Sequence, residues 1–353
     1  MNEERPRPTT LSGGPASTAD LRARAETLAG ELAQLLNAPE PELSPAFALE
    51  SRIDVTGIGA SEGPAQLLVA VLLELGWRAR FVPASSFVSE QDGREAALIV
   101  FSQGLCPNAR LALRQASRYQ TAVLLTTVTG VEKDGPLKAA LLDGFREAGG
   151  VVWSHPPARE GGSLVRLVGP ACASLAALRL ARRLGSRGAR PSWCERLNEV
   201  PGAVDRTFDE PRSRLDADPA VFLAVGELAP LLPSLCWKWQ EGLFAPLPHA
   251  IELLSFMHGP LQSLHGRNAT LVLCTRSNST HAELDLRARL ERVLLNEPHR
   301  LITLESRLPG PLAWFEFDAA INRLLLGELD ARGLDPGHWP AQGHDAPLYQ
   351  VGE

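Results

Sequence analysis

Residues 53–75, IDVTGIGASEGPAQLLVAVLLEL, carry the pattern of a short strand, a glycine-containing loop and a helix. The first five residues are β-rich, and Leu68, Leu72 and Leu75 recur on one face of a helix expected over 64–75. A second strand, expected over 78–82, follows directly. Because a helix separates the two strands, this stretch predicts a right-handed crossover between parallel strands.

The same alternation continues along the whole chain. A helix is expected at 19–36, and the rest of the first half predicts strands at 96–101, 122–126 and 151–154 and helices at 109–118, 136–148 and 172–184. After a polar stretch at 201–219, the second half predicts strands at 221–225, 270–274 and 301–304 and helices at 234–243, 251–257, 282–295 and 317–329. The sequence therefore predicts an α/β fold of two tandem doubly wound parallel-sheet domains, 19–205 and 206–353, after a disordered tail at 1–18.

Composition narrows the class of protein. The 353 residues correspond to roughly two ordinary domains, and 35 basic against 41 acidic residues give a formal charge of −6, which argues against a nucleic-acid partner. Five scattered cysteines without a CxxC pair indicate neither a disulfide framework nor a zinc site. The longest aliphatic run, 67–73, is far shorter than the ~20 residues of a membrane span. We expect a cytoplasmic protein with no membrane partner.

Lysine is scarce in this chain. Only Lys133, Lys138 and Lys238 are lysines among the 35 basic residues, so each is a candidate for a role that arginine cannot take. Lys133 and Lys138 lie beside Glu132 and Asp134, where an exposed ion pair accounts for them. Lys238 is thus the lysine most open to a functional interpretation.

Three loops that follow predicted strands carry small polar residues. They contain Gly59 and Ser61, Ser102 and Gln103, and Thr126 and Thr127. In an open parallel sheet, ligands bind at the carboxyl ends of the strands, so these six residues are candidates for substrate binding. Gly57, Gly59 and Gly63 resemble a dinucleotide fingerprint, but the third glycine comes one position late and no acidic residue ends the second strand.

The second half supplies reactive side chains. Lys238 and Glu241 stand at i, i+3 on one predicted helix, and His258 closes a short helix before Gly259 and Pro260. A carboxylate, an ammonium and an imidazole form a plausible acid/base set for moving a proton between adjacent sugar carbons. A surface ion pair and a helix-capping histidine are the structural alternatives. No histidine spacing favours a metal site.

Together these motifs resemble the sugar isomerase domain family. Gly57 to Ser61 and Ser102-Gln103 are similar to its phosphate-binding loops, while Trp237-Lys-Trp-Gln-Glu241 and His258-Gly-Pro260 are similar to motifs of the isomerase part of glucosamine-6-phosphate synthase. The resemblance covers nearly the whole chain after residue 20. It implies a tandem-domain homodimer without cofactor, in which Glu241 transfers the proton, His258 opens the ring and Lys238 assists at substrate hydroxyls. His258 could come from the neighbouring chain.

Departures from the family pattern bear on the substrate. Gly104 replaces the second hydroxyl of the Ser-Gln-Ser loop, and Pro107 stands near the expected threonine and removes an N–H donor. The family's C-terminal lysine has no counterpart, and Asn2 stands where a glutaminase domain has its nucleophilic cysteine. We therefore expect no glutaminase activity and a weaker dependence on phosphate than in typical relatives.

These observations predict an enzyme that acts on a sugar or amino sugar, with or without phosphate. The reaction would be aldose/ketose isomerisation, deamination or deglycation, by proton transfer through an enediol-type intermediate. The alternative from another class is a non-catalytic sugar-binding or regulatory module, which the missing C-terminal lysine favours. Glu241 discriminates between the two, because only the enzyme needs its carboxylate.

Overall fold

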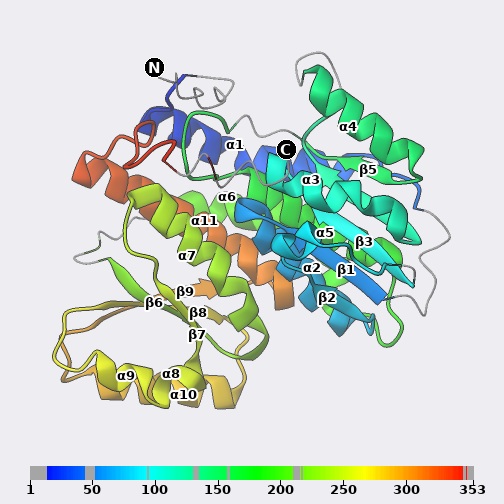
Figure 1. Ribbon diagram of the computed structural model, residues 1–353. Coiled ribbons are helices and arrows are strands. Elements are labelled where there is room, and N and C mark those ends of the chain that lie inside the picture. Colours follow the sequence, from blue (N-terminus) through cyan, green and yellow to red (C-terminus); the bar gives the residue numbers. More distant parts are fainter. Residues whose placement is uncertain are drawn as a thin grey trace.

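The protein forms two parallel β-sheets with a layer of helices between them (Figure 1). The computed structural model describes residues 14–43, 52–93, 95–129, 135–156, 160–209, 215, 218–344 and 347. Every strand pairing in both sheets is parallel, as helical crossovers require. The expected α/β class with two parallel sheets is confirmed.

The first sheet has five strands in the order β2-β1-β3-β4-β5. Their bounds are β1 (Arg52–Gly57), β2 (Ala79–Phe81), β3 (Ala96–Phe101), β4 (Thr121–Thr126) and β5 (Val151–Ser154). The second sheet has four strands in the order β7-β6-β8-β9. They are β6 (Pro219–Ala224), β7 (His249–Glu252), β8 (Thr270–Arg276) and β9 (Arg300–Ser306). Their order is the same as that of β2, β1, β3 and β4 in the first sheet, so the two halves repeat one topology.

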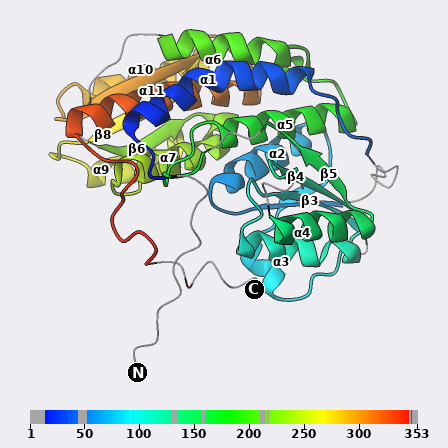
Figure 2. The ribbon, with the colours of Figure 1, turned by 90° about the horizontal axis from the view of Figure 1, so that it is seen from above.

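Helices cover both faces of each sheet (Figure 2). The layer between the sheets consists of α1 (Thr18–Asn37), α2 (Glu62–Glu74), α5 (Gly169–Leu184), α6 (Val200–Asp209), α7 (Leu232–Leu243) and α11 (Ala313–Arg332). The outer face of the first sheet packs on α3 (Pro107–Arg114) and α4 (Pro136–Glu147). The outer face of the second packs on α8 (Leu253–Met257), α9 (Pro260–Ser263) and α10 (His281–Leu294).

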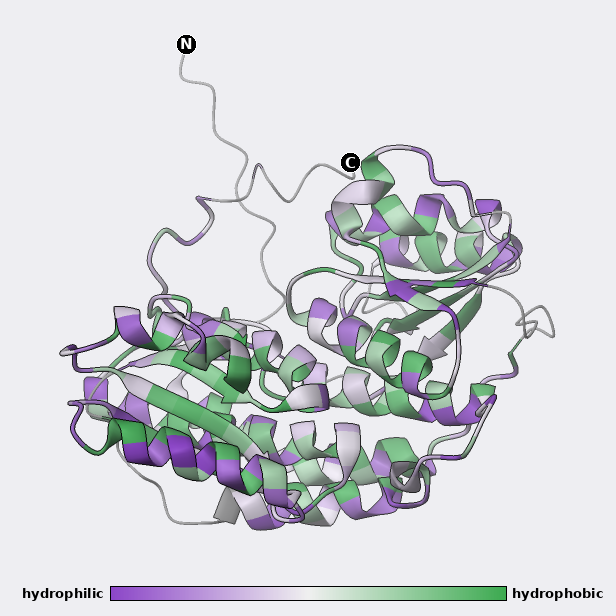
Figure 3. Ribbon diagram, turned by 90° about the horizontal axis from the view of Figure 1, so that it is seen from below, coloured by the Kyte–Doolittle hydropathy of each residue, from purple (hydrophilic) through white to green (hydrophobic). Residues whose placement is uncertain are grey.

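One hydrophobic core joins the two halves. Strand residues alternate between faces, so that Ile99 of β3 and Val272 of β8 enter the same central cluster while Leu98 and Leu273 enter the separate outer ones. Hydrophobic residues accordingly dominate both sheets and the faces of the helices turned towards them (Figure 3). Helix α1 also packs on α6 and on α11 of the second half, and α6 spans the division between the halves. The halves are therefore held together by buried apolar surface.

Three sequence expectations differ from the structure. The polar stretch 201–219 contains most of α6, because Val200, Ala203 and Val204 bury one helical face in the central core. The short helix expected over 251–257 is present as α8 but begins at Leu253, because residues 251–252 belong to the strand β7, which pairs with β6. In the expected tail, residues 1–13 lie outside the described residues, whereas Ala16 is buried and its N–H donates to the Gly162 carbonyl.

The two-domain division at 205/206 falls inside α6, and we retain it as a proposal. Among the described residues, no helix has the combination of length and apolar content that crossing a bilayer demands.

The turn after β1 depends on Gly57. A Cβ at this position would lie 2.3 Å from the Ser61 carbonyl oxygen, a backbone atom that cannot rotate away. We expect Gly57→Ala to lower the free energy of unfolding by about 1–3 kcal/mol, as overpacking does. Gly144→Ala in α4, where nothing lies within 4 Å of the added Cβ, should instead raise it by up to about 1 kcal/mol. Urea denaturation of both variants measures the difference, and equal effects would contradict this account of the turn.

Candidate active site

A small cavity lies between the two halves of the chain. Its wall from the first half consists of Ala60, Gly63, Arg166 and Pro170, and its wall from the second half consists of Ser234, Trp237, Lys238, Glu241, Trp314 and Asp318. The volume is about 20 Å³, close to what one water molecule requires. Lys238 and Glu241, which stand one turn apart on α7, thus face the same space.

The two halves approach closely beside this cavity. A Cβ at Gly63 of α2 would lie 2.6 Å from the Ser234 Cβ of α7, so only glycine fits there. Ser234 Oγ also accepts a hydrogen bond of 3.0 Å from Trp314 Nε1 and donates one of 3.1 Å to the Leu231 carbonyl. These bonds hold the Trp314 indole in the cavity wall.

Lys238 forms a buried ion pair with Asp318 of α11. The side chains are 4% and 1% exposed, and the Lys238 ammonium donates directly to Asp318 Oδ1. Asn322 Nδ2 lies 3.4 Å from Asp318 Oδ2 and 3.4 Å from the Leu167 carbonyl oxygen, so it links the pair to the first half. Burial raises the pKa of the Asp318 carboxyl, and the positive charge of Lys238 offsets part of that rise.

Glu241 has a pKa suited to proton transfer near neutrality. Burial raises the pKa of its carboxyl from 4.5 to about 7, while the positive charges of Arg166 and Lys238 lower it by smaller amounts. A general base is most effective when its pKa lies near the working pH. Glu241 therefore combines a position in the cavity wall with the protonation behaviour of an acid/base group.

The raised pKa of Glu241 predicts a pH dependence of stability. Between pH 4.5 and about 7 the folded chain holds a proton on Glu241 that the unfolded chain has lost. The contribution of Glu241 to the free energy of unfolding should therefore fall as pH rises through this window, by up to about 3 kcal/mol, while buried His155, whose pKa is lowered from 6.5 to about 4, contributes in the opposite direction. Glu241→Gln should remove the Glu241 contribution and leave that of His155, so the stability of the variant should rise relative to that of the wild type between pH 5 and pH 8. Urea denaturation at pH 5 and pH 8 tests it, and an identical slope in the variant would contradict it.

The glycine loop after β1 reaches the cavity. Gly59 has a φ of +57°, a left-handed conformation that favours glycine, and it places Ala60 in the cavity wall next to Ser61. Ser61 is buried, and its N–H donates to the Ile58 carbonyl. Of this loop only Ala60 lines the cavity with Lys238 and Glu241, and the expected binding positions Gly59 and Ser61 are its chain neighbours.

Gln103 lies at the start of α5 together with Glu160. A Cβ at Gly169 would lie 2.0 Å from Gln103 Nε2, and the Glu160 carboxylate accepts hydrogen bonds of 2.6 Å from the N–H groups of Val168 and Gly169. It also accepts one from the N–H of Leu167, while Gln103 Nε2 lies 3.5 Å from its Oε2. Gln103 thus lies against Gly169, the chain neighbour of Pro170 in the cavity wall, and does not itself line the cavity. Glu160 supplies the negative charge that the helix N-terminus favours.

The other substrate-binding candidates of the first half are Ser102, Thr126 and Thr127. Their side chains are buried or form hydrogen bonds with the backbone. Thr127 Oγ1 and Thr126 Oγ1 donate to the Gln103 carbonyl at 2.8 and 3.3 Å. Ser102 is buried, and its N–H donates to the Leu125 carbonyl. Ser102, Thr126 and Thr127 therefore shape the loop that carries Gln103, and they are not among the residues lining the cavity.

His258 lies away from the cavity of its own chain. It is exposed at the end of α8, on the outer side of the second sheet. Of the other lysines, Lys138 is on α4 and Lys133 lies outside the described residues. Within the described part of the chain, no group of three His, Cys, Asp or Glu side chains could hold a metal ion.

Several residues in or beside the cavity were missed by the sequence analysis, among them Asp318, Asn322, Glu160 and Arg166. Asp318 and Asn322 stand at i, i+4 in the apolar run 313–329, a spacing that signals polar groups buried on one helical face. Glu160 and Arg166 come from an irregular segment before α5 that shows no periodicity, so nothing in the sequence marked them.

The fold is that of tandem sugar isomerase domain proteins. The chain aligns with glucosamine-6-phosphate deaminase from Thermotoga maritima at a TM-score of 0.64 and 17% identity, covering 91% of this chain and 97% of that one. Tagatose-6-phosphate ketose/aldose isomerase from Escherichia coli gives 0.67 and 15%, covering 93% and 98%. The C-terminal domain of glucosamine-fructose-6-phosphate aminotransferase from Francisella tularensis gives 0.67 and 12%, covering 91% and 99%.

The resemblance inferred from the motifs is thereby confirmed at the level of the fold. No protein-family model matches the sequence, and no curated protein matches it. The sequence identities to these three solved structures are 12–17%. At this level the similarity shows a shared fold, and the activity has to be argued from the site.

Proposed function

We propose that this protein is a sugar or amino-sugar isomerase or deaminase that uses Glu241 to move a proton between adjacent carbon atoms. One observation carries the proposal: the Glu241 carboxyl faces a cavity between the two halves, and burial raises its pKa to about 7. The structural neighbours named above, which are described as acting on sugar phosphates, support the substrate class.

The chemistry requires a base, a cation and access to the substrate. Ionised Glu241 would take the proton from the carbon next to the sugar carbonyl, leaving an enediolate, and return it to the neighbouring carbon. Lys238 and Arg166, both in the cavity wall, would stabilise the negative charge that develops on oxygen. Lys238 would do so while fixed by Asp318, which holds the ammonium in place.

Binding of a sugar requires the cavity to open. A volume of about 20 Å³ is far too small for a hexose, and Trp237 and Trp314 form part of its wall. We propose that movement of these indoles, or of the two halves, admits the substrate. Because His258 is exposed and outside this cavity, its proposed role in ring opening requires a second copy of the chain, which favours the homodimer.

The proposal is tested by deuterium exchange from solvent, followed by NMR, with a hexosamine and with its 6-phosphate. Exchange at the carbon next to the carbonyl is expected with both, because Gly104 and Pro107 weaken the phosphate-binding loop. An absolute requirement for phosphate would contradict the expectation about the loop. Absence of exchange with both the hexosamine and its 6-phosphate would contradict the proposal that the protein is an enzyme.

A non-catalytic sugar-binding module is the second candidate. The neutralisation of Lys238 by Asp318 favours it. It predicts saturable sugar binding with no exchange, and equal binding by the wild type and Glu241→Gln.

A further inference from the structure

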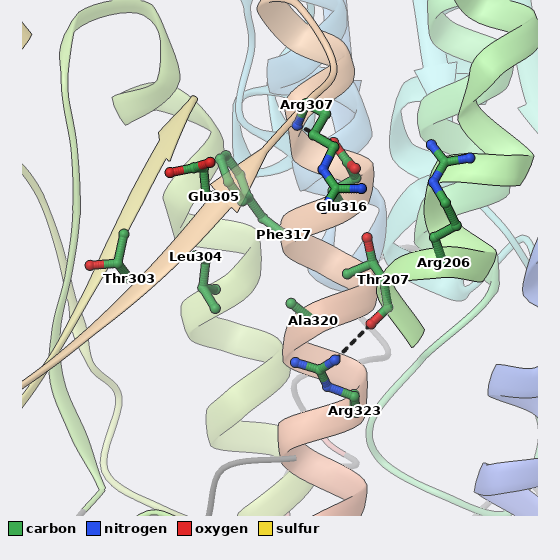
Figure 4. A pocket seen from close by; sticks show the side chains of 10 residues that line it. All are labelled: Arg206, Thr207, Thr303, Leu304, Glu305, Arg307, Glu316, Phe317, Ala320 and Arg323. Carbon is green, nitrogen blue, oxygen red and sulfur yellow. Dashed lines mark hydrogen bonds between the residues drawn. The ribbon is translucent and has the colours of Figure 1, made fainter. Parts of the chain in front are cut away.

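The cavity that Glu241 lines is shut off from solvent. No residue of its lining is exposed, and Trp237 on α7 is one of those that are only partly buried. A larger cavity of about 90 Å³, lined by residues of α6, β9 and α11, differs in this respect, because Arg206 and Arg307 in its lining are exposed (Figure 4). The two cavities share no lining residue. Access to Glu241 therefore has to come through the wall of its own cavity.

Separation of the two halves would open this wall at a high cost in free energy. The central hydrophobic cluster contains buried residues of both halves, such as Leu68 of α2 and Leu235 of α7. Moving the halves apart would expose this apolar surface to water. The helices also meet closely beside the cavity, where only a glycine fits at Gly63 against Ser234. A side chain in the wall is therefore the part that moves most readily.

The Trp314 indole is fixed in the wall. It is 2% exposed, and its Nε1 donates a hydrogen bond of 3.0 Å to Ser234 Oγ. Its ring also lies edge-on against the Phe315 ring, with 5.2 Å between the centroids. Rotation of Trp314 would leave a buried donor without its acceptor, which opposes the movement.

The Trp237 indole is not held in this way. It is partly exposed, and among the described residues its side chain takes part in no hydrogen bond or ring contact. Two χ1 rotamers are open to an aromatic side chain on a helix. The indole can therefore turn from one to the other without losing a polar partner.

Trp237 stands one turn before Glu241 on α7. Residues at i and i+4 are neighbours on a helix surface, and both of these side chains line the cavity. Side chains on a helix lean towards its N-terminus, so that of Glu241 lies over the turn that carries Trp237. Burial raises the pKa of the Glu241 carboxyl to about 7, as expected where apolar surface replaces water around it. The Trp237 indole is thus placed to separate Glu241 from solvent.

We propose that Trp237 is the gate of the Glu241 cavity. Turned inwards, its indole closes the wall over Glu241, and turned outwards it opens a path from solvent. That the molecule admitted is a sugar rests on the proposed function, whereas the gate itself does not. Closure behind a bound sugar would exclude water from the carboxylate and from the enediolate.

The test is chemical modification of Glu241 by a water-soluble carbodiimide and glycine ethyl ester, followed by mass spectrometry. The reagent is far larger than the cavity of about 20 Å³, so it reacts with Glu241 only when the wall opens. Exposed Glu147 should react fast, and Glu241 more slowly but measurably. Because the open state of such an equilibrium is usually populated at about 0.1–10%, Trp237→Ala should speed the modification of Glu241 by at least about tenfold.

Two controls separate the gate from a general loosening of the protein. Trp339→Ala removes a partly buried indole outside the cavity, and Glu241 should react in it at the wild-type rate. Glu328 is 3% exposed and lies outside the cavity, so its reaction reports unfolding. It should stay as slow in Trp237→Ala as in the wild type.

Three results would overturn the proposal. Glu241 that never reacts in the wild type while Glu147 does would show a fixed wall, and equal Glu241 rates in Trp237→Ala and the wild type would place the opening elsewhere. Equal acceleration at Glu241 and Glu328 would trace the exposure to unfolding. The modification needs no sugar, so a gated protein without deuterium exchange would contradict the proposed function and leave the gate standing.

Discussion

Glu241→Gln should lower proton exchange between solvent and a bound sugar by at least about 100-fold, the usual contribution of a positioned general base. The amide has nearly the shape of the carboxyl, so packing in the cavity between α7 and α11 is preserved. Because the amide cannot accept the proton from carbon, exchange is lost while sugar binding remains. NMR detection of deuterium incorporation measures the effect, and binding is followed separately by calorimetry.

The matched control is Glu147→Gln, at the exposed end of α4. It makes the same chemical change far from the cavity and should exchange at the wild-type rate. Unchanged exchange in Glu241→Gln would show that another group abstracts the proton, and it would remove the central residue of the proposed mechanism.

Loss of the Lys238–Asp318 ion pair should have the largest effect on stability. Lys238→Met leaves the Asp318 carboxylate buried without its cation, and Asp318→Asn leaves the ammonium buried without its anion. Breaking a buried pair in this way costs about 3–5 kcal/mol. The double variant Lys238→Met/Asp318→Asn buries no charge, so its loss should be clearly smaller than the sum of the two single losses. Urea denaturation of the four proteins measures the cycle, and additive losses would contradict a direct pair.

The same lysine should matter for turnover in a way that its charge alone does not explain. Lys238→Arg keeps the charge but places a larger planar group in a space fitted to an ammonium. We expect exchange to fall at least about tenfold in Lys238→Arg and to stay unchanged in Lys138→Arg on the surface of α4. Equal rates in the two variants would contradict a role for Lys238 in the site.

Much of the fold could be predicted because the strands are strongly patterned. The runs that became β3 and β4 are buried on both faces, so their apolar sequence was unambiguous. Strand β7 was not predicted, because it is an edge strand with exposed His249 and Ala250 whose conformation depends on pairing with β6. Helix α6 was missed because only packing on the core reveals which of its residues are buried.

The site was predictable only in part. Spacing placed Lys238 and Glu241 on one helical face, and the structure has both in one cavity wall. Spacing does not tell which side chains come from distant segments, so the partner of Lys238, eighty residues along the chain, was not found. For the same reason the cavity lined by residues of α6, β9 and α11 left no local signal in the sequence.

The pH dependence of proton exchange tests the central claim most directly. If Glu241 is the base, exchange in the wild-type protein under subsaturating sugar should rise about tenfold per pH unit below pH 7 and level off above it. The midpoint should follow the Glu241 pKa of about 7. A rate that is constant between pH 5.5 and 8, or a midpoint near the ordinary carboxyl value of 4.5, would contradict the assignment of Glu241 as the buried base.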